Sequence, residues 1–476
     1  MIKAEIQTGS VQASNIKQTV AAGNQSVQTR ENKMGTQPVI PLLVSMSIPP
    51  VISMFLQYTY NFVDCMFVAW LSQDALTAVS LAFPIMTLIL SISIGLGVGT
   101  NALIARRLGA KDQDGANNIV THSIIISAVV GTLVTIIALL VVKPFFHAYT
   151  NDPVIYQLGL DFSNIVVFMA LGNMLHICVQ KIIQATGNML APMLFQIAGV
   201  VLNFVLDPIL IFGLLGAPAL GVKGAAIATV SGYTFSMVLG FYVLICTKQK
   251  VKIKIKDFHI EWKLFLDIIV VGLPSLVMNA LGALMVVFAN IFLAAYSMTA
   301  VAFFGIYFKI QQLVTMTVNG LIQGCMPVMG YNYGAKNRQR LMETFKTGLA
   351  IAIGMMGFGT VILWIFPTQA LKLFQASKHM MEFGVPALRI MSASYILAAC
   401  GFMFASFFQA TGRVKYSLLI NLLRQLILLV PLMALLSKVL HMSGIWWAFP
   451  MAEIITTVFC FILFFQMEIK NRVSIR

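Results

Sequence analysis

Long apolar runs separated by short polar breaks make up almost the whole chain after its first forty residues. The run from Ile119 to Val142 contains no charged residue, and the run from Val414 to Ser437 contains only Lys415 and Arg424. A helix rises about 1.5 Å per residue, so roughly 20 apolar residues cross the hydrocarbon core of a bilayer. Because these runs are continuous and do not alternate, they predict membrane-spanning α-helices and not the strands of a barrel.

The breaks divide the chain into twelve predicted spans, so the predicted fold class is an all-α polytopic membrane protein. Composition supports this class. Hydrophobic residues make up 59% of the chain, charged residues 10%, and the mean hydropathy is +0.88, which leaves too little polar surface for a water-soluble body. The predicted spans are 41–70, 77–104, 119–142, 155–183, 191–214, 224–247, 265–295, 300–328, 345–366, 381–408, 415–437 and 444–468.

The second half of the chain repeats the first. Gly109-Ala110-Lys111 recurs as Gly334-Ala335-Lys336, an offset of 225 positions (334 − 109), and Gln184-Ala185-Thr186-Gly187 recurs at the same offset as Gln409-Ala410-Thr411-Gly412. Each repeat holds six spans, so both halves start on the same side and are related by a pseudo-two-fold axis along the membrane normal. We expect two six-helix bundles, an N-lobe over 38–247 and a C-lobe over 264–468, that rock against each other.

Lys and Arg gather in the loops on one side of the predicted membrane. Cytoplasmic loops carry an excess of these residues, so both termini are predicted to be cytoplasmic. The basic residues that give the chain its net charge of +15 would then lie next to anionic lipid headgroups. Because these residues are scattered over the loops between spans, we expect no nucleic-acid partner. The predicted cytoplasmic segments are a disordered tail over 1–37, a basic linker over 248–263 and a C-terminal tail over 469–476.

Signatures of soluble enzymes and of cofactors are missing from the sequence. It contains no Gly-x-x-x-x-Gly-Lys-Ser/Thr loop for a nucleotide, no His-Glu-x-x-His and no Gly-x-Ser-x-Gly. The six cysteines have no paired spacing, which argues against disulfides and a zinc site. We therefore expect neither enzymatic activity nor a cofactor, and transport driven by an ion gradient or by the solute's own gradient.

Ionisable residues inside the N-terminal spans are candidates for ion coupling, because placing a charge in the membrane is costly. Asp64 and Asp207 lie in the first and fifth spans. Asn203 is four residues before Asp207, so the two share a helix face, and Pro208 frees a backbone carbonyl nearby. Two interpretations remain open at this point: a proton or Na⁺ site at Asp64, Asn203 and Asp207, or hydrogen bonds that only tie neighbouring helices together.

The C-terminal spans carry different ionisable residues. Lys309, Arg424 and Glu453 lie within them, whereas the positions 225 after Asp64 and Asp207 are Ala289 and Leu432. Ion coupling is therefore predicted for the N-terminal half alone. Structural pairing among the C-terminal charges is the favoured interpretation, and the alternative is a substrate cavity. The candidate cavity residues are Lys309, Gln312, Arg424 and Glu453.

The order of the motifs resembles that of the multidrug and toxic compound extrusion (MATE) family, over nearly the whole chain after the tail. The resemblance is strongest to the bacterial branch related to DNA-damage-inducible protein F and to Gram-positive multidrug exporters. The matching motifs are Asn61-Phe62-Val63-Asp64, Leu108-Gly109-Ala110-Lys111, Gln184-Ala185-Thr186-Gly187, Leu206-Asp207-Pro208-Ile209-Leu210 and Gly330-Tyr331-Asn332-Tyr333-Gly334-Ala335.

The resemblance implies a V-shaped, monomeric antiporter in the bacterial inner membrane that expels organic cations in exchange for H⁺ or Na⁺. It also implies an N-lobe cation site, whose positions fall here on Asp64, Gln180, Asn203, Asp207 and Thr229. Gln180 departs from the family pattern, which has a carboxylate or a shorter amide at this position. That departure leaves the choice between H⁺ and Na⁺ open.

Three other functions compete with the antiporter. A lipid flippase of the same superfamily would need a lipid-sized groove and a cationic cavity, for which Lys309 and Arg424 are candidates. A membrane sensor would need a signalling domain, and neither terminus is long enough to fold as one. A passive channel would transport without an imposed pH or Na⁺ gradient.

Overall fold

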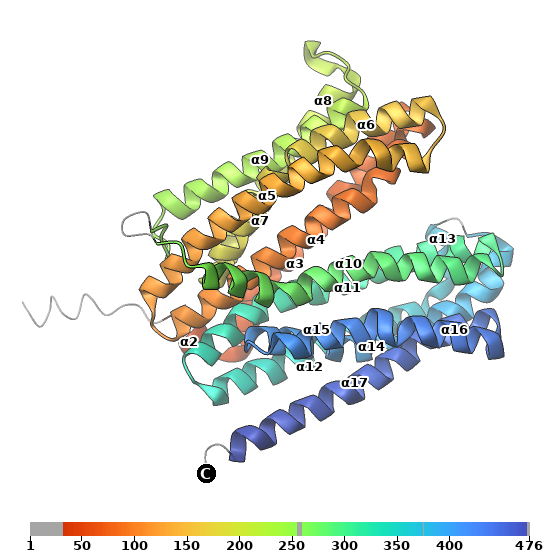
Figure 1. Ribbon diagram of the computed structural model, residues 1–476. Helices are drawn as coiled ribbons and strands as arrows, with labels where there is room; N and C mark the ends of the chain where they lie inside the picture. The colour runs from red at the N-terminus through yellow and green to blue at the C-terminus, as the bar shows by residue number, and fades with distance from the viewer. Residues whose placement is uncertain (1–31, 255–258, 375, 474–476) are drawn as a thin grey trace, which may run out of the picture.

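The computed structural model describes residues 32–254, 259–374 and 376–473, and over these residues the chain forms helices and turns without a β-strand. Eleven of the helices are long and apolar enough to cross a membrane, and a bent pair brings the number to 12. The predicted fold class is confirmed (Figure 1).

The N-lobe is defined here as helices α3 to α9 and the C-lobe as α10 to α17. The N-lobe consists of α3 (Val39–Leu71), α4 (Gln73–Gly109), α5 (Gln113–Tyr149), α6 (Pro153–Phe168), α7 (Ala170–Ala185), α8 (Leu190–Phe212), a short 3-10 turn (Leu214–Gly216) and α9 (Val222–Cys246). The C-lobe consists of α10 (Trp262–Ala294), α11 (Met298–Gly334), α12 (Arg338–Ile365), α13 (Pro367–Leu373), α14 (Lys378–Ala410), α15 (Val414–Leu422), a π-helical segment (Leu423–Ile427), α16 (Leu429–Leu440) and α17 (Met442–Val473).

Two of the predicted spans are not single regular helices. The span predicted over 155–183 is broken into α6 and α7, which meet at an angle of 44°. The span predicted over 415–437 contains the π-helical segment between α15 and α16. The other predicted spans coincide with helices that are longer than predicted by a few residues at one or both ends.

The predicted terminal segments differ from the structure at their inner edges. Residues 1–31 of the expected tail lie outside the described residues, but Lys33–Thr36 form a one-turn helix, α2, and Met34 is fully buried. At the other end α17 continues to Val473, so 469–473 are helical and not an extended tail. The predicted linker ends earlier than expected because α10 begins at Trp262, and its residues 255–258 are outside the described part.

Equivalent capping residues start the helices of both lobes. Ser72 accepts a hydrogen bond at the start of α4 and Ser297 does so at the start of α11, and these residues are one repeat apart. The same holds for Asp112 and Asn337, which cap α5 and α12. A side-chain oxygen at this position satisfies a backbone N–H that the first turn of a helix leaves free. The duplication therefore preserves the helix boundaries as well as the sequence motifs.

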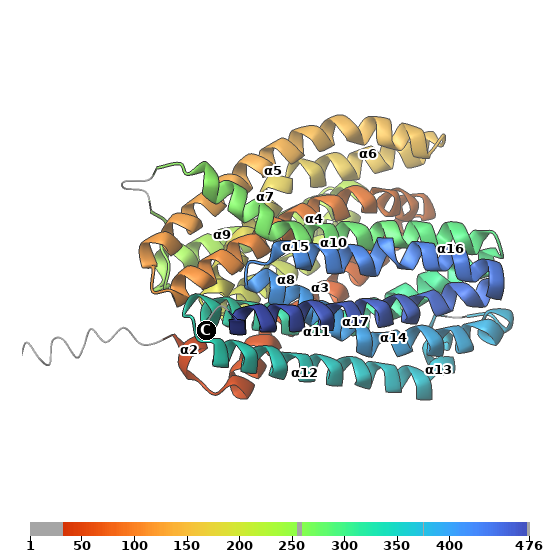
Figure 2. The same cartoon turned by 60° about the horizontal axis from the view of Figure 1, so that its bottom comes forward.

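The two lobes meet at the end of the molecule where Arg106, Arg107, Lys111 and Lys336 lie, called the basic end here. In Figures 1 and 2, α2 and the C-terminal end of α17 lie at this end. Away from it, α5 and α6 lean away from the C-lobe in Figure 1. The molecule is therefore V-shaped, with its vertex at the basic end.

Glycines allow the close approach of the lobes at the basic end. A Cβ added to Gly109 would collide with the carbonyl of Tyr331, and one added to Gly334 would collide with the carbonyl of Arg106. Gly109 and Gly334 are one repeat apart, so each lobe presents the same glycine to the other lobe. Only a residue without a side chain permits backbones to pack this closely. The repeated Gly-Ala-Lys motif is thus explained by a symmetric contact between lobes.

Polar side chains add hydrogen bonds between the lobes near the same end. Arg106 of α4 donates from Nε to the carbonyl of Ala410 at 2.7 Å and from a terminal nitrogen to that of Gln409. Lys181 of α7 donates from Nζ to Oε1 of Gln323 in α11 at 2.7 Å. These hydrogen bonds between the lobes can form only while the basic end is closed.

We predict that Arg106→Ala weakens closure at the basic end. A hydrogen bond from a charged group contributes about 1.5–3 kcal/mol, so the ratio of closed to open molecules should fall by roughly tenfold or more. The measurement is the distance between spin labels at the exposed positions Asp114 and Gln339, in a background without the six native cysteines. Arg107→Ala is the matched control, because Arg107 pairs with Asp112 of its own lobe at 2.7 Å. Equal distance distributions for both variants would contradict this role.

Candidate functional site

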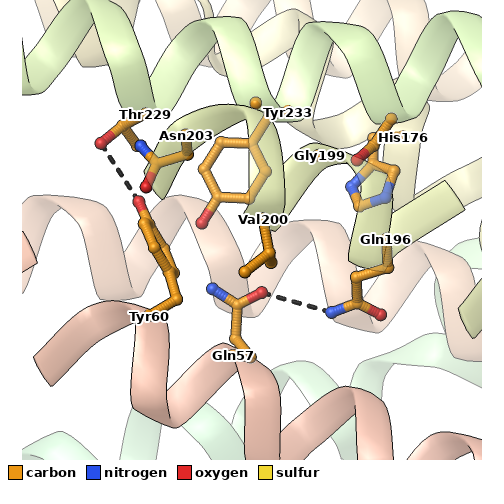
Figure 3. Close-up of a pocket in the computed structure, with 11 residues that line it drawn as sticks. Gln57, Tyr60, His176, Gln196, Gly199, Val200, Asn203, Thr229 and Tyr233 are labelled. Carbon is orange, nitrogen blue, oxygen red and sulfur yellow. Dashed lines mark hydrogen bonds between the residues drawn. The ribbon is translucent and has the colours of Figure 1, made fainter. Parts of the chain in front are cut away.

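A small cavity lies inside the N-lobe, between α3, α7, α8 and α9. Its volume is about 20 Å³, and all the residues that line it belong to the N-lobe (Figure 3). The residues around it are mostly polar, which is unusual for the interior of a membrane-spanning bundle. They are Gln57, Tyr60, His176, Gln196, Gly199, Val200, Asn203, Thr229, Gly232, Tyr233 and Ser236.

Glycines bring α8 and α9 close enough to place polar side chains side by side. A Cβ on Gly232 would lie 2.8 Å from the carbonyl oxygen of Gly199 and 3.1 Å from Cβ of Asn203. The backbones of the two helices are therefore nearly in contact at this level. Thr229, about one turn before Gly232, and Tyr233, directly after it, are held beside Asn203 as a result (Figure 3).

The carboxyl groups predicted for ion coupling lie together next to this cavity. Asn203 donates from Nδ2 to Oδ1 of Asp207 at 3.4 Å, and the two residues are 2% and 1% exposed. The carboxyl groups of Asp64 and Asp207 interact electrostatically across the α3–α8 contact. Oδ1 of Asp64, Oδ1 of Asn203 and Oδ2 of Asp207 are buried with no hydrogen-bond partner among the described residues.

Tyr60 connects Thr229 to the carboxyl pair. Its hydroxyl donates to Oγ1 of Thr229 at 3.1 Å, and it interacts electrostatically with both Asp64 and Asp207. Sequence analysis did not identify Tyr60. The available signal was its spacing, because a residue four positions before Asp64 lies on the same helix face.

Within the described part of the chain, Gln180 makes no direct hydrogen bond to the other predicted site residues. It donates from Nε2 to Oε1 of Gln196 at 2.9 Å, and Gln196 donates in turn to Gln57 at 3.2 Å. The residue of α7 that lines the cavity is His176, one turn before Gln180. The structure thus brings together Asp64, Asn203, Asp207 and Thr229. Gln180 is connected through Gln196 to Gln57, which lines the same cavity as Asn203 and Thr229.

The unpaired oxygens suit a proton or a hard cation. Carboxylate and amide oxygens are typical ligands of such ions, and a proton needs only one acceptor. No cluster of three or more His, Cys, Asp or Glu side chains that could hold a metal occurs in the described part of the chain. Three unpaired oxygens, those of Asp64, Asn203 and Asp207, are therefore available to an exchangeable ion. These ligands do not match those of a permanently bound transition metal.

Of the four candidate cavity residues in the C-lobe, Arg424 and Glu453 form an ion pair. Arg424 donates to Glu453 at 2.8 Å from a terminal nitrogen and at 3.1 Å from Nε, and its guanidinium lies 4.1 Å from the ring centroid of Phe402. Lys309 and Gln312 take no part in this pair. Lys309 is exposed on α11 and acts electrostatically on Cys65 of α3, so its ammonium group faces the N-lobe.

Comparison with known proteins agrees with this architecture. The sequence model of the MatE family matches residues 49–209 and 274–435, one segment in each lobe. The multidrug export protein MepA of Staphylococcus aureus (strain MRSA252) is 26% identical over 428 residues, which is 87% of this chain and 91% of that protein.

Two solved structures have the same fold. One is described as the outward-facing conformation of a multidrug resistance MATE family transporter of the MOP superfamily. It is 27% identical, with a TM-score of 0.86 over 93% of this chain and 98% of that one. The other is a MOP superfamily transporter from Pyrococcus furiosus, described as having a binding pocket of reverse polarity. It is 28% identical, with the same TM-score and coverage.

Two lobes of six spans, joined at one end and carrying unpaired buried carboxyl oxygens in the N-lobe, define a membrane transporter built from two repeated bundles. The chain belongs to the MatE family.

We predict that Glu453→Gln destabilises the C-lobe. The side chains of Arg424 and Glu453 are only 6% and 14% exposed, and removing one partner of a buried ion pair costs about 3–5 kcal/mol. Thermal unfolding of the purified protein in detergent should therefore begin at a lower temperature. The double variant Arg424→Met/Glu453→Leu should recover most of the loss, because it leaves no unpaired charge. An unchanged melting temperature for Glu453→Gln would contradict the structural role of this pair.

Proposed function

We propose that this protein is a secondary active multidrug efflux antiporter that exports organic cations in exchange for H⁺ or Na⁺. The observation that carries the proposal is the asymmetry of the buried carboxyl groups. Asp64 and Asp207 keep unpaired oxygens in the N-lobe, whereas the C-lobe carboxylate Glu453 is paired with Arg424. The name of the similar S. aureus protein, a multidrug exporter, supports the choice of substrate.

In the proposed exchange, the coupling ion and the drug bind preferentially to different conformations of the N-lobe. Protonation or cation binding at Asp64 and Asp207 removes the negative charge that would attract a cationic drug. It also changes the bond between Asn203 and Asp207, next to Pro208, where the helix lacks a backbone hydrogen bond. A helix weakened at this point bends more easily, so ion binding and helix shape are coupled.

The orientation of the molecule in the membrane is part of the proposal. The basic end faces the cytoplasm of a bacterial cell, because Lys and Arg concentrate in its loops, and α2 and the C-terminal end of α17 lie there. The described conformation, closed at the basic end, is then the outward-open state of a monomer in the inner membrane. Similarity to a structure described as outward-facing supports this assignment. No enzymatic step and no cofactor other than the coupling ion is part of the proposal.

A lipid flippase is the second candidate function. Lys309 favours it, since an exposed ammonium group on α11 that faces the N-lobe could bind a lipid phosphate. Transport of a fluorescent cation, with no movement of labelled lipid between leaflets, would distinguish the antiporter from the flippase.

We predict that Asp207→Asn abolishes ion-driven export. Asparagine keeps the size and the hydrogen bond to Asn203 but cannot release a proton or carry a charge. In liposomes, with pH and Na⁺ gradients imposed separately, efflux of ethidium should fall by roughly tenfold or more. The gradient that drives the wild type identifies the coupling ion.

Asp161→Asn is the matched control for this experiment. Asp161 is a carboxylate in the N-lobe that pairs with Lys223 at 3.4 Å and is remote from the cavity lining. Its variant should transport at the wild-type rate. If Asp207→Asn also expels ethidium as fast as the wild type under either gradient, the proposed coupling site is wrong.

A further inference from the structure

The one-turn helix α2 lies at the basic end, where the two lobes meet (Figures 1 and 2). Its residue Met34 is fully buried and belongs to the same hydrophobic cluster as Met189 of the N-lobe and Met329 of the C-lobe. A helix of one turn is unstable by itself in water, because so few hydrogen bonds do not offset the entropy lost by ordering the backbone. The order of α2 therefore depends on the surfaces against which it packs.

The C-lobe binds the backbone of α2. The carbonyl oxygen of Met34 accepts a hydrogen bond from Nδ2 of Asn332 at 3.0 Å and another from Nε of Arg340 at 3.1 Å. A terminal nitrogen of Arg340 also donates to the carbonyl of Gln37. The position 225 before Arg340 is Gly115 (340 − 225), so the N-lobe has no counterpart of this donor. The C-lobe thus carries an arginine whose bonds to α2 the duplication does not explain.

The N-lobe contacts the side chains of α2 at the turn after α7. Gly187 lies in this turn with a φ of +89°. The three atoms nearest to a Cβ added to Gly187 belong to Met34 and Lys33, at distances of 3.3, 3.4 and 3.5 Å. Met34 is therefore in van der Waals contact with the backbone of the N-lobe while its carbonyl is hydrogen-bonded to the C-lobe.

The repeat of the sequence shows which contact α2 replaces. Gly412 is the counterpart of Gly187 in the C-lobe, and the three atoms nearest to a Cβ added there all belong to Arg106 of the N-lobe. The counterpart of Arg106 is Tyr331 (106 + 225), so a symmetric interface would bring Tyr331 to the turn at Gly187. Tyr331 packs against α2, with Cε1 at 3.0 Å from a Cβ added to Gly35. Residues of α2 therefore occupy, in one half of the interface, the place that Arg106 occupies in the other half.

The chain connects α2 closely to the C-lobe side of this interface. Only Gln37 and Pro38 separate it from α3. Val39 and Leu42, in the first turn of α3, belong to the buried cluster that the C-lobe helices mainly form. A separation of the lobes at the basic end would therefore leave α2 on the C-lobe and break its contact with Gly187.

We propose that residues 32–37 form a clasp that stabilises the closed basic end and must leave the turn at Gly187 before this end opens. The clasp touches both lobes only in the closed conformation, so it shifts the equilibrium toward that conformation. Arg106 makes the equivalent contact from within a membrane-spanning helix. The clasp precedes the first span, so it can leave its place without deforming a span.

Met34→Ser tests the clasp through the closure itself. Serine removes most of the buried apolar side chain and keeps the backbone carbonyl that the C-lobe binds, so the ratio of closed to open molecules should fall by about tenfold. Spin labels at Asp114 and Gln339 measure this ratio in a background without the six native cysteines. Thr36→Ala is the matched control, because Thr36 is an exposed residue of the same helix, and its distance distribution should equal that of the wild type.

Arg340→Gln is a second variant that leaves the sequence of the clasp unchanged. It removes the donors to the carbonyls of Met34 and Gln37 and should shift the spin-label distances in the same direction.

Cysteine labelling measures the departure of the clasp directly. Residue 34 is fully buried, so Met34→Cys should react slowly with a maleimide in the cysteine-free background. Adding Arg106→Ala should raise this rate by about tenfold, because labelling follows the population of the open state when closing is fast. Thr36→Cys, at an exposed position, should react rapidly with and without Arg106→Ala.

Unchanged spin-label distances in both Met34→Ser and Arg340→Gln would overturn the clasp. So would a Met34→Cys labelling rate that stays low while Arg106→Ala moves the spin labels apart, because the basic end would then open with α2 still in place. All these measurements are made without substrate or ion gradient. They test the clasp separately from the proposed exchange, which depends on the transport activity of Asp207→Asn.

Discussion

Every polar group inside a bilayer must find its partner within the protein, and this constraint shapes the whole molecule. Helices satisfy the backbone, and most hydroxyls in the spans donate to a carbonyl one turn earlier, as Ser93 does to Ile89 at 2.8 Å. Against this background, a carboxyl oxygen or an imidazole nitrogen without a partner is conspicuous. Buried atoms of Asp64, Asp207 and His176 lack a partner among the described residues, and the coupling ion that we propose would provide one for the two carboxyl groups.

The same constraint explains how the two lobes are joined. Backbone contact through Gly109 and Gly334 brings the two lobes together at the basic end. Arg106 and Lys181 then bind carbonyl and amide oxygens and not carboxylates, so each bond is strong enough to hold closure and weak enough to break. Opening this end exposes both cations to water, which replaces the lost bonds.

Much of the fold could be predicted from the sequence because its signals are local. Continuous apolar runs define spans, and repeated motifs define the two lobes. Asn203 and Asp207 could be paired from their spacing on one helix. The association of Asp64 with Asp207 depended on family resemblance, since the two are far apart in the chain, and their function remains a prediction.

Features that depend on packing between distant helices could not be predicted. The bend between α6 and α7 has no proline to mark it, and α2 is ordered because Met34 packs between elements of both lobes. His176 looks like any buried aromatic residue in the sequence. Its place beside the cavity results from the packing of α7 against α9, and Tyr60 is at the site because α3 packs against α8.

The π-helical segment, Leu423–Ile427, records an insertion of one residue after the duplication. The family match spans one residue more in the second half than in the first, and a π turn absorbs one extra residue within a helix. Before this segment, buried Phe195 corresponds to buried Ile420 at the original offset. After it, buried Asn203 and Asp207 correspond to buried Leu429 and Met433, one position further on. The structural counterpart of Asp207 is thus Met433 and not Leu432. The extra residue is taken up by the π-helical segment, so the residues after it still turn their buried side toward the interior of the lobe.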